Sequence, residues 1–202
     1  MHGVKGTMAS GPRLARPRRA ADGLPAFFHR LSPAAQRIYL RSDAIETFNL
    51  APSPAALRMT AALTNMLTEG RQAAAALLAR RLADELCRLL QVRPIDIEVR
   101  GVRPHNARGE LHGIFYPSRP PRIVLWMRTA QRHQTVKPRT FIRTLLHEIG
   151  HYLDYALLRL GDSFHTSGFF KRESSLVRAL LPESETAAAR SVAKDSDRDR
   201  GA

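Results

Sequence analysis

Residues 145–154 read LLHEIGHYLD, a run that places three ionisable side chains inside an otherwise apolar stretch. His147 and His151 are four residues apart, so on an α-helix their side chains share one face, with Cβ atoms about 6 Å apart. Burying these two groups and Glu148 within about one and a half turns is costly unless each has a partner. Any fold of this chain must therefore bring polar partners or a metal ion to this helix.

The rest of the chain predicts one globular domain with an α+β fold. A chain of 202 residues that is 44% apolar and 25% charged can bury one core of ordinary size. Residues 1–24 are basic and rich in glycine and proline, and residues 183–202 are small and polar, so both ends are expected to be disordered or loosely helical. The domain is expected to span residues 25–182, with a helical part at 25–92 and the site-bearing core at 95–182.

Several helices are marked by their capping residues. Ser-Pro pairs at residues 32–33 and 53–54 offer a capping hydroxyl and a first-turn proline, and leucines within residues 71–90 recur along one stripe. Towards the C-terminus, residues 138–160 predict one helix that begins at a proline and stops before a glycine. Residues 167–181 predict a second closing helix, ended by the proline that follows.

Three short runs between these helical parts predict a small three-stranded sheet. IDIEVRGV alternates apolar and polar residues, LHGIFYP is short and aromatic, and RIVLWM is continuously apolar. RIVLWM is expected to be an edge strand. The predicted order is therefore N-terminal helices, a sheet, and two closing helices.

Composition excludes some classes of protein and leaves others open. Cys87 is the only cysteine, so an internal disulfide and a cysteine-based zinc site are excluded, and a lone buried thiol suits a reducing compartment. No apolar run is long enough to span a bilayer, and the basic N-terminus lacks the apolar region of a secretory signal. We therefore expect a cytoplasmic protein. Nothing in the sequence indicates its oligomeric state.

The formal net charge of +14 makes nucleic acid a conceivable partner, because a basic protein is attracted to phosphate backbones. The basic residues are, however, spread along the chain and are not interleaved with aromatic residues on one face. Nucleic acid is therefore a partner that the sequence allows but does not favour.

The spacing His-Glu-x-x-His on a helix carries a specific chemistry. His147 and His151 can together hold one zinc ion, because neutral imidazole is a good zinc ligand. Glu148 lies between them and can take a proton from a water that zinc has made acidic, then hand that proton to a leaving amine. The motif therefore predicts one zinc ion and a general base.

The segment LLHEIGHYLD, preceded by RIVLWM and followed by a second helix, resembles the core of the zincin metallopeptidases over about residues 95–182. This resemblance implies hydrolysis of peptide bonds. It also implies that an extended peptide or protein segment is bound by main-chain pairing to an edge strand, for which IVLWM is the candidate.

Catalytic zinc needs a third protein ligand, and Glu173 is the preferred candidate. It falls in the centre of an apolar stripe between Phe169 and Leu176, where a carboxylate is costly unless it is paired or binds a metal. Antiparallel packing of the two closing helices would also bring it level with His151. A set of His147, His151 and Glu173 is similar to that of minimal gluzincins.

His165, in DSFHTSGFF, is the alternative third ligand. Its distance from His151 resembles the spacing in SprT-like proteins, which act near DNA, although Thr166 stands where those proteins usually have glycine. If Glu173 is the ligand, we expect His165 either to donate a hydrogen bond to the developing oxyanion or to be a polar residue flanking the helix.

Two more charged residues lie near the predicted ligands. Asp154 follows His151 by three residues and is expected to be a solvated helix residue, with an orienting contact to a ligand imidazole or a bond to the metal as alternatives. Arg172 is expected to face solvent, with a pair to Asp154 or to a substrate carboxylate as alternatives.

The sequence as a whole predicts a zinc-dependent metallopeptidase with Glu148 as general base and acid. Two other functions stay open: a basic, nucleic-acid-associated SprT-like protein, and a regulatory module that keeps the zinc site without hydrolysing a substrate.

Overall fold

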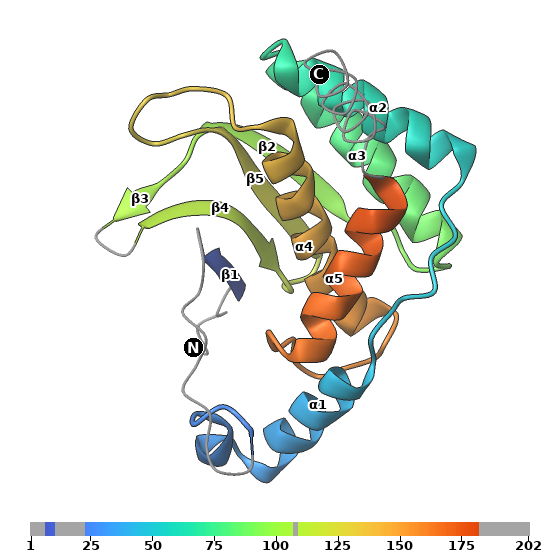
Figure 1. Ribbon diagram of the computed structural model, residues 1–202, viewed down its shortest axis with the longest axis vertical. Helices are drawn as coiled ribbons and strands as arrows, with labels where there is room; N and C mark the ends of the chain where they lie inside the picture. Colours follow the sequence, from blue (N-terminus) through green and yellow to red (C-terminus); the bar gives the residue numbers. More distant parts are fainter. Residues whose placement is uncertain (1–6, 11–22, 107–108, 182–202) are drawn as a thin grey trace, which may run out of the picture.

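The computed structural model describes residues 7–10, 23–106 and 109–181, and it shows five α-helices around one curled, mixed sheet (Figure 1). The predicted α+β class is confirmed. The tail at residues 183–202 and most of the segment 1–24, both predicted to be disordered, lie outside the described residues.

The N-terminal helices begin where their capping residues predict. Helices α1 (Pro33–Ala44) and α2 (Pro54–Thr68) are followed by α3 (Gln72–Leu89). The Ser32 hydroxyl accepts a hydrogen bond from the Ala35 amide at 3.2 Å, and the Ser53 hydroxyl accepts one from the Ala56 amide at 3.1 Å. Each serine thus satisfies an amide that the first turn leaves without a partner.

The sheet contains the three predicted strands and two more. The predicted ones are β2 (Asp96–Val102), β4 (Gly109–Tyr116) and β5 (Arg122–Arg128), and the additional ones are β1 (Thr7–Ser10) and β3 (His105–Asn106). The strand order is β1-β4-β5-β2, with β3 paired to β4. Strand β5 runs parallel to β2 and antiparallel to β4.

The prediction that RIVLWM forms an edge strand is wrong, because this segment is β5 and lies between β4 and β2. Residues 123–127 are all buried, which means that both faces of the strand are covered. A continuous apolar run is the pattern of such an interior strand, whereas an edge strand with one solvated face would alternate.

Strand β1 (Thr7–Ser10) lies within the segment 1–24 that the sequence predicts to be disordered. These residues pair antiparallel with β4, with Thr7 opposite Phe115 and Ala9 opposite Gly113. Pairing of this kind uses main-chain groups, which composition does not report. The strand covers an edge of β4 that would otherwise leave amides and carbonyls unpaired.

The main core lies between one face of the sheet and the helices α2, α3, α4 and α5. Its largest fully buried side chains include Phe115, Phe141 and Leu63. Cys87 on α3 is buried in the same cluster, as predicted, and burial raises the pKa of its thiol to about 11. A smaller apolar cluster gathers around Trp126.

The two closing helices are α4 (Pro138–Ala156) and α5 (Ser167–Leu180). None of the helices in the described part of the chain combines the length and the apolar composition that a bilayer crossing requires.

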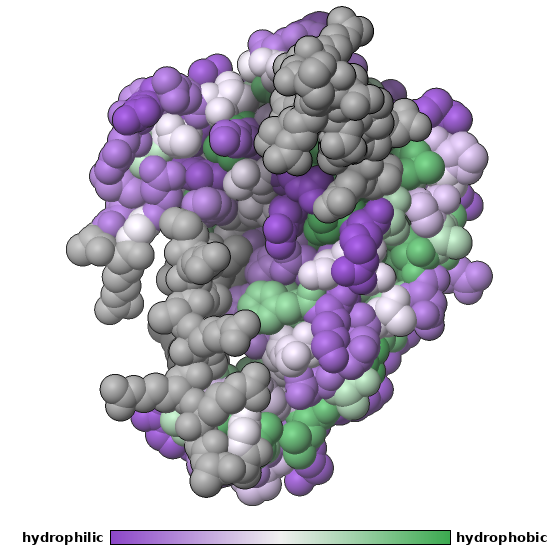
Figure 2. Space-filling model, viewed as in Figure 1, coloured by the Kyte–Doolittle hydropathy of each residue, from purple (hydrophilic) through white to green (hydrophobic). Residues whose placement is uncertain are grey.

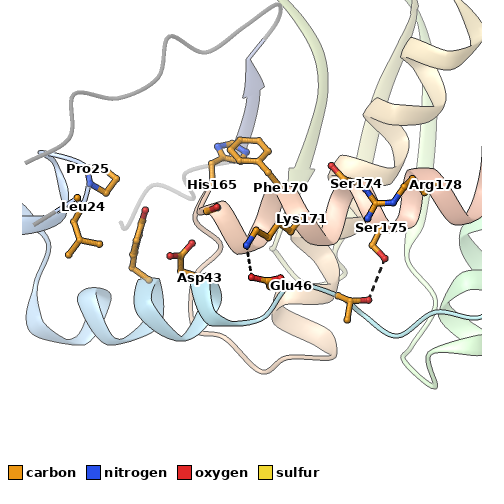
Figure 3. Close-up of a pocket in the computed structure, with 14 residues that line it drawn as sticks. Leu24, Pro25, Asp43, Glu46, His165, Phe170, Lys171, Ser174, Ser175 and Arg178 are labelled. Atoms are coloured by element: carbon orange, nitrogen blue, oxygen red, sulfur yellow. Dashed lines mark hydrogen bonds and ion pairs between the residues drawn. The ribbon is translucent and has the colours of Figure 1, made fainter.

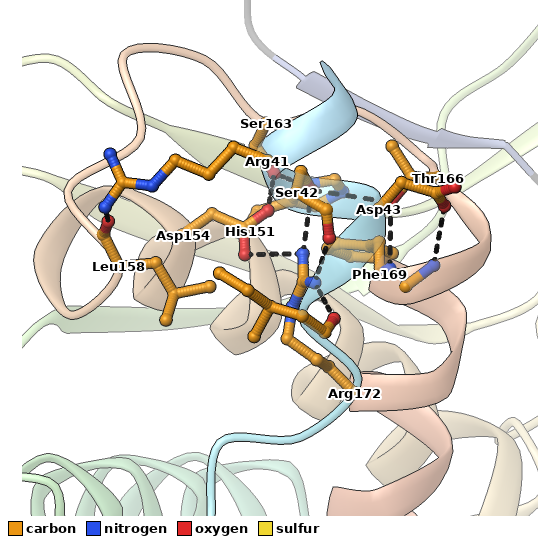
Figure 4. Close-up of polar contacts among 12 residues, drawn as sticks. Arg41, Ser42, Asp43, His151, Asp154, Leu158, Ser163, Thr166, Phe169 and Arg172 are labelled. Carbon is orange, nitrogen blue, oxygen red and sulfur yellow. Dashed lines mark hydrogen bonds and ion pairs between the residues drawn. The ribbon is translucent and has the colours of Figure 1, made fainter. Parts of the chain in front are cut away.

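Helix α5 is fastened to the end of α1 by a buried arginine. Arg172 donates to the carbonyl oxygen of Ser42 at 2.6 Å, to the Ser42 hydroxyl at 2.9 Å and to the carbonyl oxygen of Ile45 (Figure 4). The side chain is fully buried, so the expectation that Arg172 faces solvent is wrong. Among the described residues, the Ser42 carbonyl otherwise accepts only a long hydrogen bond of 3.4 Å from the Ile45 amide at the end of α1. Carbonyl groups at the C-terminal end of a helix carry partial negative charge and therefore suit a cation.

Gly168 allows this close contact. Its amide donates to Asp43 Oδ1 at 3.0 Å, and a Cβ added to it would lie 2.3 Å from the Asp43 carbonyl oxygen and 2.6 Å from that of Ser42. Both oxygens belong to the main chain, so they cannot rotate away.

We therefore expect Gly168→Ala to lower the free energy of unfolding by about 1–3 kcal/mol or more, because the two helices must separate to admit a methyl group. Urea denaturation measures the change. Gly101→Ala is the matched control, since its new Cβ would lie 3.7 Å from the nearest atom, and it should stay within about 0.5 kcal/mol of the wild type. Equal unfolding midpoints for all three proteins would contradict this packing.

Candidate metal centre

Three imidazole rings converge between α4 and the loop that precedes α5. His147 and His151 are on α4, and His165 lies just before Thr166, the residue that caps α5. The Nε2 atom of His147 is 3.1 Å from that of His151, and the Nε2 atom of His165 is 3.0 Å from each of them. The three histidines are close enough to bind one metal ion.

The other ring nitrogen of His151 is held by a buried relay (Figure 4). His151 Nδ1 lies 2.7 Å from the Ser163 hydroxyl, and that hydroxyl donates to Asp154 Oδ2, also at 2.7 Å. A serine has one proton to give, so His151 must donate its Nδ1 proton to Ser163. The Nε2 atom of a neutral His151 is then left with a free lone pair that faces the other two rings.

Asp154 and Arg172 anchor this relay. Arg172 Nη2 donates to Asp154 Oδ1 at 3.0 Å, and both side chains are fully buried. Burial raises the pKa of Asp154, while the guanidinium of Arg172 and the hydroxyl of Ser163 act against that rise. Asp154 was expected to be solvated, and that expectation is wrong. It lies instead where it orients the candidate ligand His151 through Ser163, which is the geometry of the orienting alternative.

Glu173 holds the Nδ1 atom of His147, as Ser163 holds that of His151. Its Oε2 lies 3.1 Å from His147 Nδ1, and its Oε1 accepts from Arg143 at 3.3 Å. Burial raises the pKa of Glu173, but hydrogen bonds from His147 and Arg143 outweigh burial and leave the pKa below its ordinary value. An ionised carboxylate only accepts, so the Nδ1 proton stays on His147.

The structure therefore does not place Glu173 where the sequence predicted. Glu173 contacts Nδ1 of His147, which faces away from the other two rings. The third nitrogen beside the Nε2 atoms of His147 and His151 is Nε2 of His165. The Glu173 carboxylate does have polar partners on its apolar stripe, and these are His147 and Arg143. His165 does flank α5, in the loop before Thr166, and its Nε2 atom lies 3.0 Å from those of His147 and His151.

The protonation of the three rings makes the space between them suitable for a cation. Burial holds the pKa of His151 well below its usual range, and burial together with His147 lowers the pKa of His165 to about 4. His147 and His151 both keep their proton on Nδ1, so their Nε2 atoms face each other with two lone pairs. One proton from His165 could satisfy only one of them. A metal ion would satisfy all three, and zinc binds imidazole at about 2.0–2.1 Å.

Two phenylalanines at the start of α5 fix the rings. Phe169 stacks on His151 with ring centroids 4.5 Å apart, and Phe170 stacks on His165 at 5.6 Å. Phe169 is fully buried, whereas Phe170 is 42% exposed. The centre is therefore packed on the His151 side and more open on the His165 side.

Glu148 is the residue that most clearly lacks a partner. It has no exposed surface, and neither carboxylate oxygen has a hydrogen-bond partner in the described part of the chain. Burial raises its pKa well above the ordinary value, and the nearby main chain of Phe115 only partly offsets this rise. A carboxylate in this setting binds a proton strongly, which is the property required of a general base.

A cavity of about 880 Å³ adjoins the centre on the side of His165 (Figure 3). Phe170 and His165 border it, and its walls come from residues 23–25, from α1 and the segment that follows it, and from α5. The ion pair between Lys171 and Glu46 and the contact between Ser175 and Thr47 line it. The cavity is large enough for part of a bound molecule and leads directly to a candidate ligand.

Comparison of the chain with protein-family models, with curated protein sequences and with solved structures found no match in any of the three.

Sequence reasoning did not identify Ser163 as part of the site. A serine in a loop after a helix has no distinctive pattern, and its contact with His151 arises only when the chain turns between α4 and α5. The one available signal was the group DSFH, in which a hydroxyl lies two residues before a histidine.

Ser163→Ala should weaken metal binding by about 10- to 100-fold, because His151 loses the acceptor that fixes its tautomer and ring orientation. The affinity can be measured by competition with a chromophoric zinc chelator. Ser174→Ala, on α5 and outside the relay, should bind as the wild type does. Equal affinity of the Ser163 variant and the wild type would contradict the role of the relay.

Glu148 should make the stability of the metal-free protein depend on pH. The pKa of Glu148 is raised in the folded protein, so above the unfolded pKa of about 4.3 the group ionises more readily in the unfolded state. The buried carboxyl group therefore lowers the free energy of unfolding, and this loss grows with pH. Glu148→Gln removes this loss. With a metal chelator present, this variant should therefore be more stable than the wild type at pH 8. The difference between their free energies of unfolding should shrink towards pH 5.

Urea midpoints across this pH range test the point. Glu69→Gln, at the exposed end of α2, is the control and should show no such trend. A difference between Glu148→Gln and the wild type that does not change with pH would mean that the carboxylate is not buried as described.

Proposed function

We propose that this protein is a zinc-dependent metallopeptidase. His147, His151 and His165 hold the ion, and Glu148 is the general base and acid. The observation that carries the proposal is the convergence of three Nε2 atoms within 3.1 Å of one another on the helix that also bears a buried carboxylate without a partner. His165 replaces Glu173 in the ligand set that the sequence predicted.

Three neutral imidazoles with a fourth position left open form the donor set of a catalytic zinc site. When bound, zinc supplies Lewis acidity, which polarises an amide carbonyl and lowers the pKa of a neighbouring water molecule. A structural site would not need Glu148, whose burial without a partner is costly. This cost favours a catalytic site over a regulatory module that only keeps the metal.

The chain's own residues would then divide the work. Glu148 takes a proton from water as the oxygen attacks the peptide carbonyl, and it delivers that proton to the leaving nitrogen as the C–N bond breaks. Its raised pKa suits it to hold the proton between these steps. Ser163 and Glu173 keep the protons of His151 and His147 on the outer nitrogens throughout.

Variants of three residues test the proposal. The purified wild type should contain about one zinc per chain by elemental analysis. His165→Ala should lose most of the metal, because a ligand is removed, whereas Glu173→Ala should keep it with about 10- to 100-fold lower affinity. Glu148→Gln should keep the metal and lose hydrolysis of an unfolded protein substrate by about 100-fold or more.

Phe170→Leu, which alters a ring beside the centre without removing a ligand or a base, is the matched control and should retain zinc. A wild type free of zinc after expression in zinc-supplemented medium would end the proposal. If His165→Ala kept its zinc and Glu173→Ala lost it, the ligand set would be His147, His151 and Glu173 as first predicted from the sequence.

A nucleic-acid-associated function is the second candidate, and two observations favour it. No acidic residue occurs between Glu110 and Glu148, and Arg132, Lys137 and Arg139 in this span are exposed. Figure 2 shows hydrophilic residues gathered over the loop between β5 and α4. A third histidine ligand is also what the resemblance to SprT-like proteins implies. Binding to duplex DNA that weakens steeply with salt would support this candidate.

A further inference from the structure

Strand β4 passes directly beside the proposed general base. A Cβ added to Gly113 would lie 3.0 Å from Glu148 Cγ and 2.7 Å from Thr144 Cγ2, so the main chain of β4 lies against α4 at this point. A side chain at position 113 would separate them. The glycine therefore lets the main chain of a sheet strand approach the residue that would move the proton.

One side of β4 is paired with β5, and the opposite side is paired with β1 (Figure 1). In this second pairing, Ala9 lies directly opposite Gly113 and Met8 opposite Ile114. The N-terminal strand thus runs antiparallel along the edge of β4 that is level with Glu148. An extended peptide would have to take this same position in order to use the main-chain groups of β4 beside the metal centre.

Strand β1 is suited to be displaced. It has only four residues, TMAS, and its pairing with β4 has a register irregularity between Ala9 and Ser10. So short a strand adds few main-chain hydrogen bonds and is held mainly because it belongs to the same chain. Glu148 has no exposed surface while β1 is in place. A substrate must be able to reach a residue that acts on it as a general base.

We propose that the edge of β4 is a docking site for an extended peptide and that Thr7–Ser10 is its resident occupant, which competes with substrate. This inference rests on the proposed function, whose regulation it describes. A tethered segment has an effective concentration of about 1 mM, so a free peptide must compete with it. Release of β1 opens the edge, and pairing of β1 closes it.

A proline within β1 tests the competition in the full-length protein. Ala9→Pro removes an amide and disfavours pairing with β4, whereas Ala21→Pro makes the same change further along the chain, outside the strand. The probe is a fluorescein-labelled peptide with the sequence of residues 4–11, VKGTMASG, and fluorescence anisotropy measures its binding. Ala9→Pro should bind it at least about tenfold more tightly than the wild type and Ala21→Pro do.

A cross-strand disulfide provides the opposite change. Met8 and Ile114 are partners in the register, so Met8→Cys/Ile114→Cys should lock β1 in place when oxidised and exclude the peptide, and reductant should restore uptake to the level of the wild type. Cys87 should not interfere, because it is 1% exposed and its pKa is raised to about 11. Hydrogen exchange of the amides at residues 111–115 should rise in Ala9→Pro and fall in the locked form.

The possible results distinguish the proposal of a docking site from the proposal of peptidase activity. Tighter peptide binding by Ala9→Pro, with faster cleavage of an unfolded protein, supports both. Tighter binding without cleavage by any form of the zinc-loaded protein supports the docking site and counts against the peptidase. Equal peptide binding by the wild type, Ala9→Pro and Ala21→Pro, or no binding by any of them, overturns the docking site whether or not the protein cleaves peptides.

Discussion

The buried ion pair between Arg172 and Asp154 is the interaction on which the candidate site depends. It joins three distant parts of the chain, because Arg172 also binds the carbonyls at the end of α1 and Asp154 holds Ser163 against His151. Removing either partner would leave a charge buried without compensation, which commonly costs several kcal/mol. The pair therefore sets the position of a candidate metal ligand, His151, and attaches α1 to the core through the same guanidinium.

His147 and His151 are held in the same way: each ring donates from Nδ1 to a protein acceptor and leaves its Nε2 atom free to face the other rings. Ser163 accepts from His151 and Glu173 accepts from His147, each at Nδ1. Because an imidazole has two nitrogens and a neutral ring has one proton, fixing the proton on the outer atom determines the donor on the inner atom. The stacked phenylalanines then hold the ring planes, so that orientation and protonation are both set before any ion arrives.

Much of this arrangement could be predicted from local pattern, and the failures have physical causes. The spacing of His147 and His151, the capped helix starts and the three main strands depend on neighbours in the sequence. Glu173 was assigned to the metal because its need for a partner was visible in the sequence, whereas the identity of that partner was not. The place of RIVLWM in the sheet and the pairing of Thr7–Ser10 depend on contacts between distant segments, which neither composition nor periodicity reports.

The attachment of α5 to α1 determines the stage of folding at which the candidate metal centre is assembled. The contact between Arg172 and Ser42 closes a loop of 130 residues, so the geometry around His151 is complete only when nearly the whole described chain has come together. During synthesis, the emerging α4 would display two histidines but lack the third ring, the relay and the anchoring arginine. The three candidate ligands would thus reach their final geometry late in folding, and an incompletely folded chain would lack the site that we propose to bind zinc.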